Sequence, residues 1–442
     1  GSSQFGSNKR FAPFFSSGLG VNIHNLKFFK ERTPWLTQFK LRGSYGMTGS
    51  VSFPSYAAQN KYELITDWQS PTGDAVQIKY LGNPNLKWEK ARQQNYGLDI
   101  NFLDGFSFNF DYFREMRDDI LVARETVPLV QGLPSSVLPR VNMGKVENYG
   151  YEMVLGWQKA LGKDWFIQVS GNYNFARNKV LEADEVRLQT GRDGYLYPYR
   201  KTGFPIGQTW VLQVDYKDGA GNGYINTEED MARYEAMYSK GGFVNAFLGQ
   251  WKFVDQNGDG VIDGADETAL GYPKLPQIIY GFTLKALFRG LDFSALFQGA
   301  GQSTTFIDGG LAFPFAGGEN PPQAAKDYWT PENTDATYPR LYGTGGGNSN
   351  NFRRGNNDWF RRSGNYLRLK NIELGYTFSR TMFPRLPLQS VRIYLSGQNL
   401  WTISDLKDFY DPEMGQVGDD ANTRGWYSPQ RKIVSVGLNI TF

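Results

Sequence analysis

The chain has 442 residues, and 47 Lys and Arg against 44 Asp and Glu give a formal net charge of only +3. This near balance gives no electrostatic case for nucleic acid, and the absence of Cys excludes a disulfide scaffold, a thiol nucleophile and Cys-ligated zinc. A single His, His24, excludes His-rich metal sites. The sequence contains no run of about 18 apolar residues, so no transmembrane helix is predicted. A membrane β-barrel would have a similarly polar composition, because only alternate residues of its strands face lipid.

An alternation of apolar and polar residues dominates the chain and predicts eleven β-strands. The clearest case is the hairpin in which 96–102 and 106–113 alternate on either side of an Asp104-Gly105 turn. A slip of the apolar phase within 366–378 predicts a β-bulge at Asn371. No long amphipathic helix is predicted. In chain order the predicted strands are 11–23, 37–48, 96–102, 106–113, 149–157, 165–175, 280–288, 291–297, 366–378, 391–401 and 432–442.

The connections between these strands alternate strictly between short and long. Outer-membrane barrels show this asymmetry, with short periplasmic turns and long extracellular loops, whereas a soluble two-sheet sandwich has little reason to obey it. The alternation therefore favours a membrane barrel, and the sandwich remains the alternative. The predicted extracellular loops are 49–95, 117–148, 176–277, 300–365 and 402–431.

The two faces of the predicted strands differ in composition. One face is apolar and aromatic, and it needs a cover that lipid or a second sheet could supply. The other face is polar, and burying it in a sandwich core without partners would cost several kcal/mol for each group. Its polar residues are Lys40, Arg42, Ser44, Asp99, Asn109, Asp111, Asn172, Lys285 and Asp292.

The last strand indicates how the chain fits into a barrel. It alternates Val434, Val436, Leu438 and Ile440 with small or polar residues and ends on the aromatic Phe442. This pattern is similar to the C-terminal signal that the outer-membrane barrel assembly machinery recognises. Bacterial single-chain barrels have even strand numbers with both ends in the periplasm. Eleven strands would leave unpaired edges in lipid, so we expect the chain to be the C-terminal half of a larger barrel.

The sharpest local motif lies toward the end of the longest predicted loop, 176–277. Residues 255–267 match the EF-hand calcium loop in ligand spacing, with Asp in place of Glu at the twelfth position and without evident flanking helices. Hard oxygen ligands suit Ca²⁺, so a structural calcium ion is predicted, and an Asx-rich solvated turn is the alternative. The predicted ligands are the side chains of Asp255, Asn257, Asp259, Asp263 and Asp266 and the carbonyl of Val261.

Catalytic motifs do not stand out. The sequence shows no G-x-S-x-G elbow, P-loop or H-E-x-x-H motif, so no enzyme is predicted. The basic stretch 353–362 with Trp359 and Phe360 could stack on bases, but a solvated loop is favoured. Aromatic residues of the long loops could stack on sugars or pack within the loops; they are Tyr195, Tyr197, Tyr199, Trp210, Trp329, Trp426 and Tyr427.

Several segments together resemble the C-terminal barrel portion of SusC/RagA-type TonB-dependent transporters. They spread over nearly the whole chain, and the set is more specific than any one of them. The segments are Gly1–Arg10 (GSSQFGSNKR), Leu81–Glu89 (LGNPNLKWE), Gly144–Glu152 (GKVENYGYE), Asn257–Gly260 with Gly271–Pro273, Asp327–Asn333 (DYWTPEN) and Tyr366–Asn371 (YLRLKN).

The resemblance implies an all-β, 22-stranded, plugged transmembrane barrel, of which residues 1–442 hold the last eleven strands. The plug and the N-terminal strands would lie in a separate chain or missing segment. Such proteins import oligosaccharides or oligopeptides across the outer membrane of Gram-negative bacteria, with a SusD-like surface lipoprotein and the TonB complex as partners. A passive porin-like channel and a soluble calcium-dependent glycan-binding β-sandwich are the alternatives.

Overall fold

The structure is a computed structural model of the chain. It describes residues 1–51, 56–70, 73–124, 126–134, 136–185, 200–218, 221–241, 246–307, 314–315, 320–341, 357–382, 385, 387–406, 409, 411–413 and 430–442. Among the predicted features, Arg353, Arg354, Tyr195, Tyr197, Tyr199, Trp426 and Tyr427 fall outside these residues.

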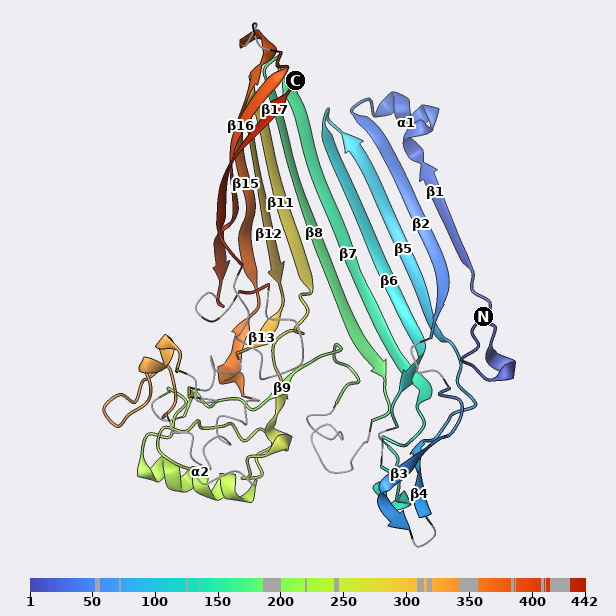
Figure 1. Ribbon diagram of the computed structural model, residues 1–442, viewed down its shortest axis with the longest axis vertical. Coiled ribbons are helices and arrows are strands. Elements are labelled where there is room, and N and C mark those ends of the chain that lie inside the picture. The colour runs from blue at the N-terminus through green and yellow to red at the C-terminus, as the bar shows by residue number, and fades with distance from the viewer. Residues whose placement is uncertain are drawn as a thin grey trace. The chain divides into compact units, whose positions relative to one another are not determined.

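One antiparallel sheet of eleven strands dominates the structure, and its strands follow one another in chain order (Figure 1). All eleven predicted strands are present, and most extend further toward the long loops than the alternation indicated. The strands are β1 (Ser16–Asn22), β2 (Leu36–Ser50), β5 (Glu89–Phe102), β6 (Phe106–Val122), β7 (Val141–Leu161), β8 (Trp165–Glu182), β11 (Ile278–Phe288), β12 (Leu291–Gly301), β15 (Tyr366–Ser379), β16 (Ser390–Ser404) and β17 (Ile433–Thr441).

The bulge predicted at Asn371 is present, one residue earlier than predicted. Asn371 pairs with Leu296 while Leu369 pairs with Phe297, so Lys370 is the extra residue of β15 against β12. On its other edge β15 faces an irregularity of β16, where Asn399 has a left-handed φ of 52°. An extra residue shifts the side-chain phase by one, which is the slip that the sequence showed.

The chain divides into two compact units, of which the first comprises Gly1–Gly156, Asn174–Leu188 and Tyr199–Ile206. Besides strands of the large sheet, this unit contains the helix α1 (Lys27–Arg32) between β1 and β2. The segment between β2 and β5 forms the hairpin β3 (Lys61–Ser70) and β4 (Gly73–Tyr80). In Figure 1, this hairpin and α1 lie at opposite ends of β2.

The second unit contains Trp157–Tyr173, Gln189–Pro198 and Gly207–Phe442. Its long segments form short paired strands, β9 (Trp210–Val211) with β10 (Thr268–Ala269), and β13 (Thr304–Phe306) with β14 (Arg361–Ser363). Short 3-10 turns occur across the whole chain: η1 (Ser7–Lys9), η2 (Ile23–Asn25), η3 (Leu129–Gln131), η5 (Gly264–Asp266), η8 (Gln323–Lys326), η9 (Asp358–Phe360) and η10 (Arg380–Met382). Where the structure describes the chain, it contains no helix that combines the length and the hydropathy needed to cross a membrane.

The second unit also contains a helix that the sequence analysis missed, α2 (Glu228–Lys240). Its buried residues are Tyr234 and Tyr238, and Met231 and Met237 pack partly buried against the same core. Positions 231, 234 and 238 have helical spacing, so a short apolar stripe was present in the sequence. A start signal was present, because Thr227 caps the helix by accepting a hydrogen bond from the backbone N–H of Asp230 at 3.1 Å. The prediction of no long helix was therefore wrong for this segment.

The two faces of the large sheet differ as predicted. On the apolar face, Leu41 is 44% exposed and Tyr96 55% in the first unit, and Leu395 and Leu438 are half-exposed in the second. The other sheets among the described residues have two strands each, so no second large sheet covers this face there. The sandwich alternative therefore has no support in the described part of the chain.

Candidate functional site

The acidic loop 255–267 is folded back on its own backbone. Both carboxylate oxygens of Asp255 accept backbone hydrogen bonds, one from Gly258 at 2.7 Å and one from Gly260 at 2.8 Å. Gly258 and Gly260 have φ values of 75° and 73°, a conformation that favours glycine. Asp259 accepts from the N–H of Val261 at 2.8 Å. The sharp turn expected at Gly260 is therefore present.

Asp266 closes this loop. Its side chain accepts hydrogen bonds from the backbone N–H groups of Gln256 and Asp263, each at 2.8 Å, so the two ends of the loop are held together. The residue is fully buried. Burial raises the pKa of its carboxyl group, and the charges of Asp255 and Asp263 act in the same direction.

The predicted ligands are thus brought into one short loop, but their oxygens are engaged with the backbone. Asp263 accepts from the N–H of Ala265 at 2.7 Å, and Asn257 accepts from that of Asp259 at 3.0 Å. Across the described residues, no group of three or more His, Cys, Asp or Glu is arranged to hold a metal ion. The calcium site therefore stays a prediction.

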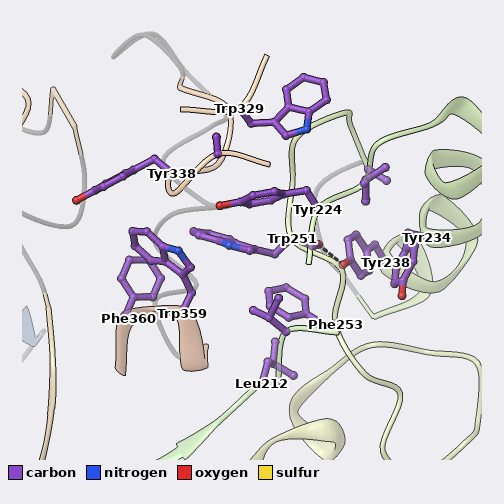
Figure 2. Packing of buried hydrophobic residues seen from close by; sticks show 14 of the residues in the cluster. Leu212, Tyr224, Tyr234, Tyr238, Trp251, Phe253, Trp329, Tyr338, Trp359 and Phe360 are labelled. Atoms are coloured by element: carbon purple, nitrogen blue, oxygen red, sulfur yellow. Dashed lines mark hydrogen bonds between the residues drawn. The ribbon is translucent and has the colours of Figure 1, made fainter. Parts of the chain in front are cut away.

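The long segments of the second unit pack around a core of aromatic side chains (Figure 2). Trp251 packs against the adjacent rings of Trp359 and Phe360, with ring centroids 5.3 Å and 5.5 Å away. Tyr238 donates a hydrogen bond to the carbonyl of Trp251 at 2.6 Å, which ties α2 to this core. We call this cluster the loop core; its buried members are Leu212, Val214, Tyr224, Ile225, Tyr234, Tyr238, Ala246, Trp251, Phe253, Ile262, Ile307, Ala325, Trp329, Ala336, Tyr338, Trp359 and Phe360.

The loop core decides between the alternatives left open for several aromatic residues. Trp329 is 2% exposed and Trp210 is also buried, so both pack inside the loops and present no face to a sugar. Phe360 and Trp359 are buried as well. The prediction that they belong to a solvated loop was wrong, because these rings pack against other aromatic residues of the loop core. Because they are buried, they also cannot stack on nucleic-acid bases.

On the polar face of the first unit, one arginine joins three strands. Arg42 of β2 binds Asp99 of β5 through Nε and Nη2, each at 2.9 Å, and binds Asp111 of β6 through Nη1 and Nη2, each at 2.8 Å. Gly97 lies directly between Arg42 and Asp111 in the register. Its missing side chain leaves room for the guanidinium group to cross β5.

The second unit contains a similar arrangement. Arg392 of β16 binds Asp292 of β12 and Glu373 of β15, and Gly375 of β15 pairs with Asp292. Arg368, near the start of β15, binds Asp411 at 2.6 Å and Glu413 at 2.8 Å in the segment after β16, and it is only 2% exposed. Sequence alternation places Arg42, Asp99 and Asp111 on the polar face, but it contains no signal for these ion pairs.

Comparison with known proteins identifies the family. A family model described as "TonB dependent receptor-like, beta-barrel" matches residues 3–260, which is more than half of the chain. The chain belongs to the TonB-dependent receptor barrel family. The eleven-stranded antiparallel sheet is the fold that this family predicts, and the SusC/RagA resemblance is confirmed by the relatives below.

Two receptors of this family illustrate the relationship. The TonB-dependent receptor P3 of Formosa agariphila is 28% identical over 467 residues, and the TonB-dependent receptor SusC of Bacteroides thetaiotaomicron is 27% identical over 455 residues. Each alignment covers 100% of this chain but 43% and 41% of the relative, respectively. This TonB-dependent barrel chain thus spans less than half the length of its curated relatives, which are named as receptors rather than as enzymes.

Solved structures of the RagAB system share the fold. A chain of the RagAB peptide transporter superposes with a TM-score of 0.71 at 23% identity, and the "open-open" state of the RagAB peptide importer gives 0.72 at 24%. Both matches cover 100% of this chain and 44% of the other. At this identity the likeness concerns the fold of the TonB-dependent barrel.

Proposed function

We propose that this chain forms part of the wall of a transporter that imports oligosaccharides or oligopeptides across the outer membrane of a Gram-negative bacterium, with energy supplied through TonB. Membership of the TonB-dependent receptor family supports the location and the energy source. The resemblance to SusC/RagA-type transporters implies these two substrate classes, and the RagAB structure that shares the fold is described as a peptide transporter.

The observation that carries this proposal is the contrast between the two faces of the sheet. The polar face holds ion pairs such as Arg42 with Asp99 and Asp111, while the opposite face exposes Leu41 and Tyr96. Hydrocarbon tolerates an apolar surface and excludes unpaired backbone groups, so such a sheet suits a barrel wall with a polar lumen. In this arrangement the long loops face the cell exterior and Phe442 lies at the periplasmic end.

The edges of the sheet support a larger barrel. Strands β1 and β17 stand at the two ends of the strand order, and their residues are exposed almost throughout. In lipid each edge would need a further strand. We propose that residues 1–442 supply the C-terminal barrel half, and that the remaining strands and the plug come from a separate chain or missing segment. A SusD-like lipoprotein would cover the extracellular loops.

Uptake by cells that express the full-length protein tests this function. We expect labelled oligosaccharides or oligopeptides to accumulate in cells with TonB and not in cells from which TonB has been deleted. Uptake that is unchanged without TonB would instead establish the passive porin-like channel. Failure to take up either class under both conditions would contradict the proposed substrates.

We also propose a structural Ca²⁺ ion in the loop 255–267, held by Asp255, Asn257, Asp259, Asp263 and Asp266 and by the carbonyl of Val261. The donors are oxygen atoms, the loop ends are already joined through Asp266, and a cation would relieve repulsion among the aspartates. The carboxylates would exchange some backbone hydrogen bonds for the ion. The ion would order the loop that meets the lipoprotein or the substrate, without taking part in any reaction.

Calorimetric titration of the full-length protein with Ca²⁺ alone tests this site. We expect saturable binding that is lost in Asp259→Ala, while barrel assembly is unchanged. Asp335→Ala, which removes an exposed carboxylate outside the loop, is the matched control and should bind Ca²⁺ as the wild type does. Absence of binding by the wild type, or equal binding by Asp259→Ala, would contradict the site.

A further inference from the structure

A small cavity of about 170 Å³ lies on the first unit, lined by Tyr45, Arg92, Gln94, Arg114 and Met116. The strand register places these residues in two adjacent rows. Tyr45, Gln94 and Arg114 form one row across β2, β5 and β6, and Arg92 pairs with Met116 in the next. Side chains two positions apart on a strand share a face, so all five point to the same side of the sheet.

That side is the apolar face. Steps of two forward along β5 lead from Gln94 to Tyr96 and Leu98, and steps of two back along the antiparallel strand β2 lead from Tyr45 to Leu41. Tyr96 stacks on Tyr112 of β6 with centroids 6.5 Å apart. The row of Tyr45, Gln94 and Arg114 is therefore about 7 Å along the sheet from this pair of tyrosines. It lies toward the end of β5 at which the long segment 51–88 enters the strand. Tyrosine rings of this kind mark the level of lipid headgroups.

Beyond the tyrosines this face becomes polar, and the cavity there is lined by Gln94 and by two arginines, Arg92 and Arg114. Arg92 binds Asp118 through Nε and Nη2, and Arg114 binds Glu147 through the same two atoms, at 2.7 Å for Nε and 2.6 Å for Nη2. Within the described residues neither Nη1 atom has a hydrogen-bond partner. The side chains remain 45% and 47% exposed. Each guanidinium group thus keeps donors that face outward.

We propose that this cavity binds the phosphate group of a membrane lipid at the headgroup level. Two outward arginine forks match the oxygen geometry of a phosphate, and Tyr45 and Met116 offer apolar surface to the part of the lipid next to its headgroup. The paired carboxylates of Asp118 and Glu147 fix the two forks without using all their donors. The inference rests on the proposed position of the sheet in a membrane, and it is independent of what the transporter imports.

The test uses the full-length transporter in phosphatidylcholine nanodiscs that contain a minor fraction of phosphatidic acid. Native mass spectrometry of the released barrel counts the phosphatidic acid that stays bound. We expect the double variant Arg92→Gln, Arg114→Gln to retain about tenfold less than the wild type, since it loses charge-assisted hydrogen bonds. Arg114→Lys keeps the positive charge but loses the paired donors of the guanidinium group, so its retention of phosphatidic acid should lie between those of the wild type and the double variant. This single variant tests the proposal even if the double variant assembles poorly.

Arg117→Gln is the matched control. Arg117 lies on the same strand β6 and is also ion-paired, to Glu115, but it points to the polar face. It should retain phosphatidic acid as the wild type does. Equal retention by the wild type, the double variant and Arg114→Lys, or an equal loss in Arg117→Gln, would overturn the proposal.

Two further arms identify the ligand. Replacing phosphatidic acid by uncharged diacylglycerol should abolish retention, and inorganic phosphate at the same concentration should not displace the lipid. Displacement by inorganic phosphate would show a site for the free ion and contradict a lipid ligand. Failure of the wild-type protein to enter nanodiscs would instead contradict the membrane position assumed in the proposed function.

Discussion

Arg42 lies directly over Gly97, so close that a Cβ atom at position 97 would stand 2.8 Å from Nε of the arginine. We expect Gly97→Ala to push Arg42 away from Asp99 and Asp111 and to lower the free energy of unfolding by about 1–3 kcal/mol. Urea unfolding of the full-length protein in lipid vesicles measures this change. Gly43→Ala is the control on the adjacent strand, since its nearest neighbour would be an atom of Tyr96 at 3.9 Å. Equal stability of the two variants would show that Gly97 is not needed for the ion pairs.

Replacing the buried Arg368 should be more harmful. Arg368→Met would remove the ion pair with the largely buried Asp411 and would leave the largely buried Glu413 paired with Lys370. Removing one partner of a buried ion pair typically costs about 3–5 kcal/mol. The same unfolding measurement should show a smaller loss for Lys370→Met, because that side chain is 22% exposed. A milder effect for Arg368→Met than for Lys370→Met would contradict this account.

The loop core should respond to pH through Asp358. This side chain accepts a hydrogen bond from the N–H of Val214 at 2.9 Å, and burial raises the pKa of its carboxyl group above the ordinary value of 3.8. The folded state therefore holds this proton more tightly than the unfolded state does. Its contribution to stability is fully present below about pH 4 and is lost as the pH rises through the raised pKa.

Asp358→Asn should therefore flatten the fall in stability of the loop core as the pH rises above about 4. Hydrogen exchange of the backbone amides around Trp251 and Phe360, measured against pH in both proteins, follows this stability locally. An Asn oxygen can still accept the bond from Val214, so the comparison isolates the charge. A steeper dependence in Asp358→Asn would show that the sign is wrong.

The chain should not fold as an isolated monomer. Its edge strands β1 and β17 are exposed, and they need further strands to satisfy their backbone groups in lipid. Expressed alone, we expect residues 1–442 to aggregate, and to assemble when the missing portion is supplied. Size-exclusion chromatography and circular dichroism would reveal the contrary result, a monodisperse, β-rich monomer that needs no detergent.

The sequence predicted the eleven strands because a strand with one polar and one apolar face repeats every two residues. It did not predict α2, where Tyr234 and Tyr238 are buried and Met231 and Met237 pack partly buried beside them, within a segment rich in charged residues. The alternation also gives no information on register. Arg42 lies 57 positions before Asp99 and 69 before Asp111, and only strand pairing brings the three together.

In the acidic loop, too, the sequence predicted only what depends on neighbouring residues. Its spacing predicted the ligands Asp255 and Asp266 and the turn at Gly260, since these follow from local geometry. The position of Arg92 and Arg114 on the same face as Tyr96 could not be read in this way, because the predicted strands 96–102 and 106–113 stopped short of both residues. The real strand β5 begins at Glu89 and carries the alternation past the tyrosines.

Labelling of single cysteines on intact cells tests most directly whether this chain forms part of a barrel wall in the outer membrane, with its long loops on the cell exterior and its short turns in the periplasm. Residues 1–442 contain no Cys, so Lys217→Cys in a long segment and Lys163→Cys in the turn between β7 and β8 each add one reactive site to this chain, and the unsubstituted full-length protein gives the background. Both side chains are exposed. In cells expressing the full-length protein, a membrane-impermeant maleimide should label Lys217→Cys, and should label Lys163→Cys only after the outer membrane is permeabilised. Labelling of Lys163→Cys from outside intact cells would contradict the account.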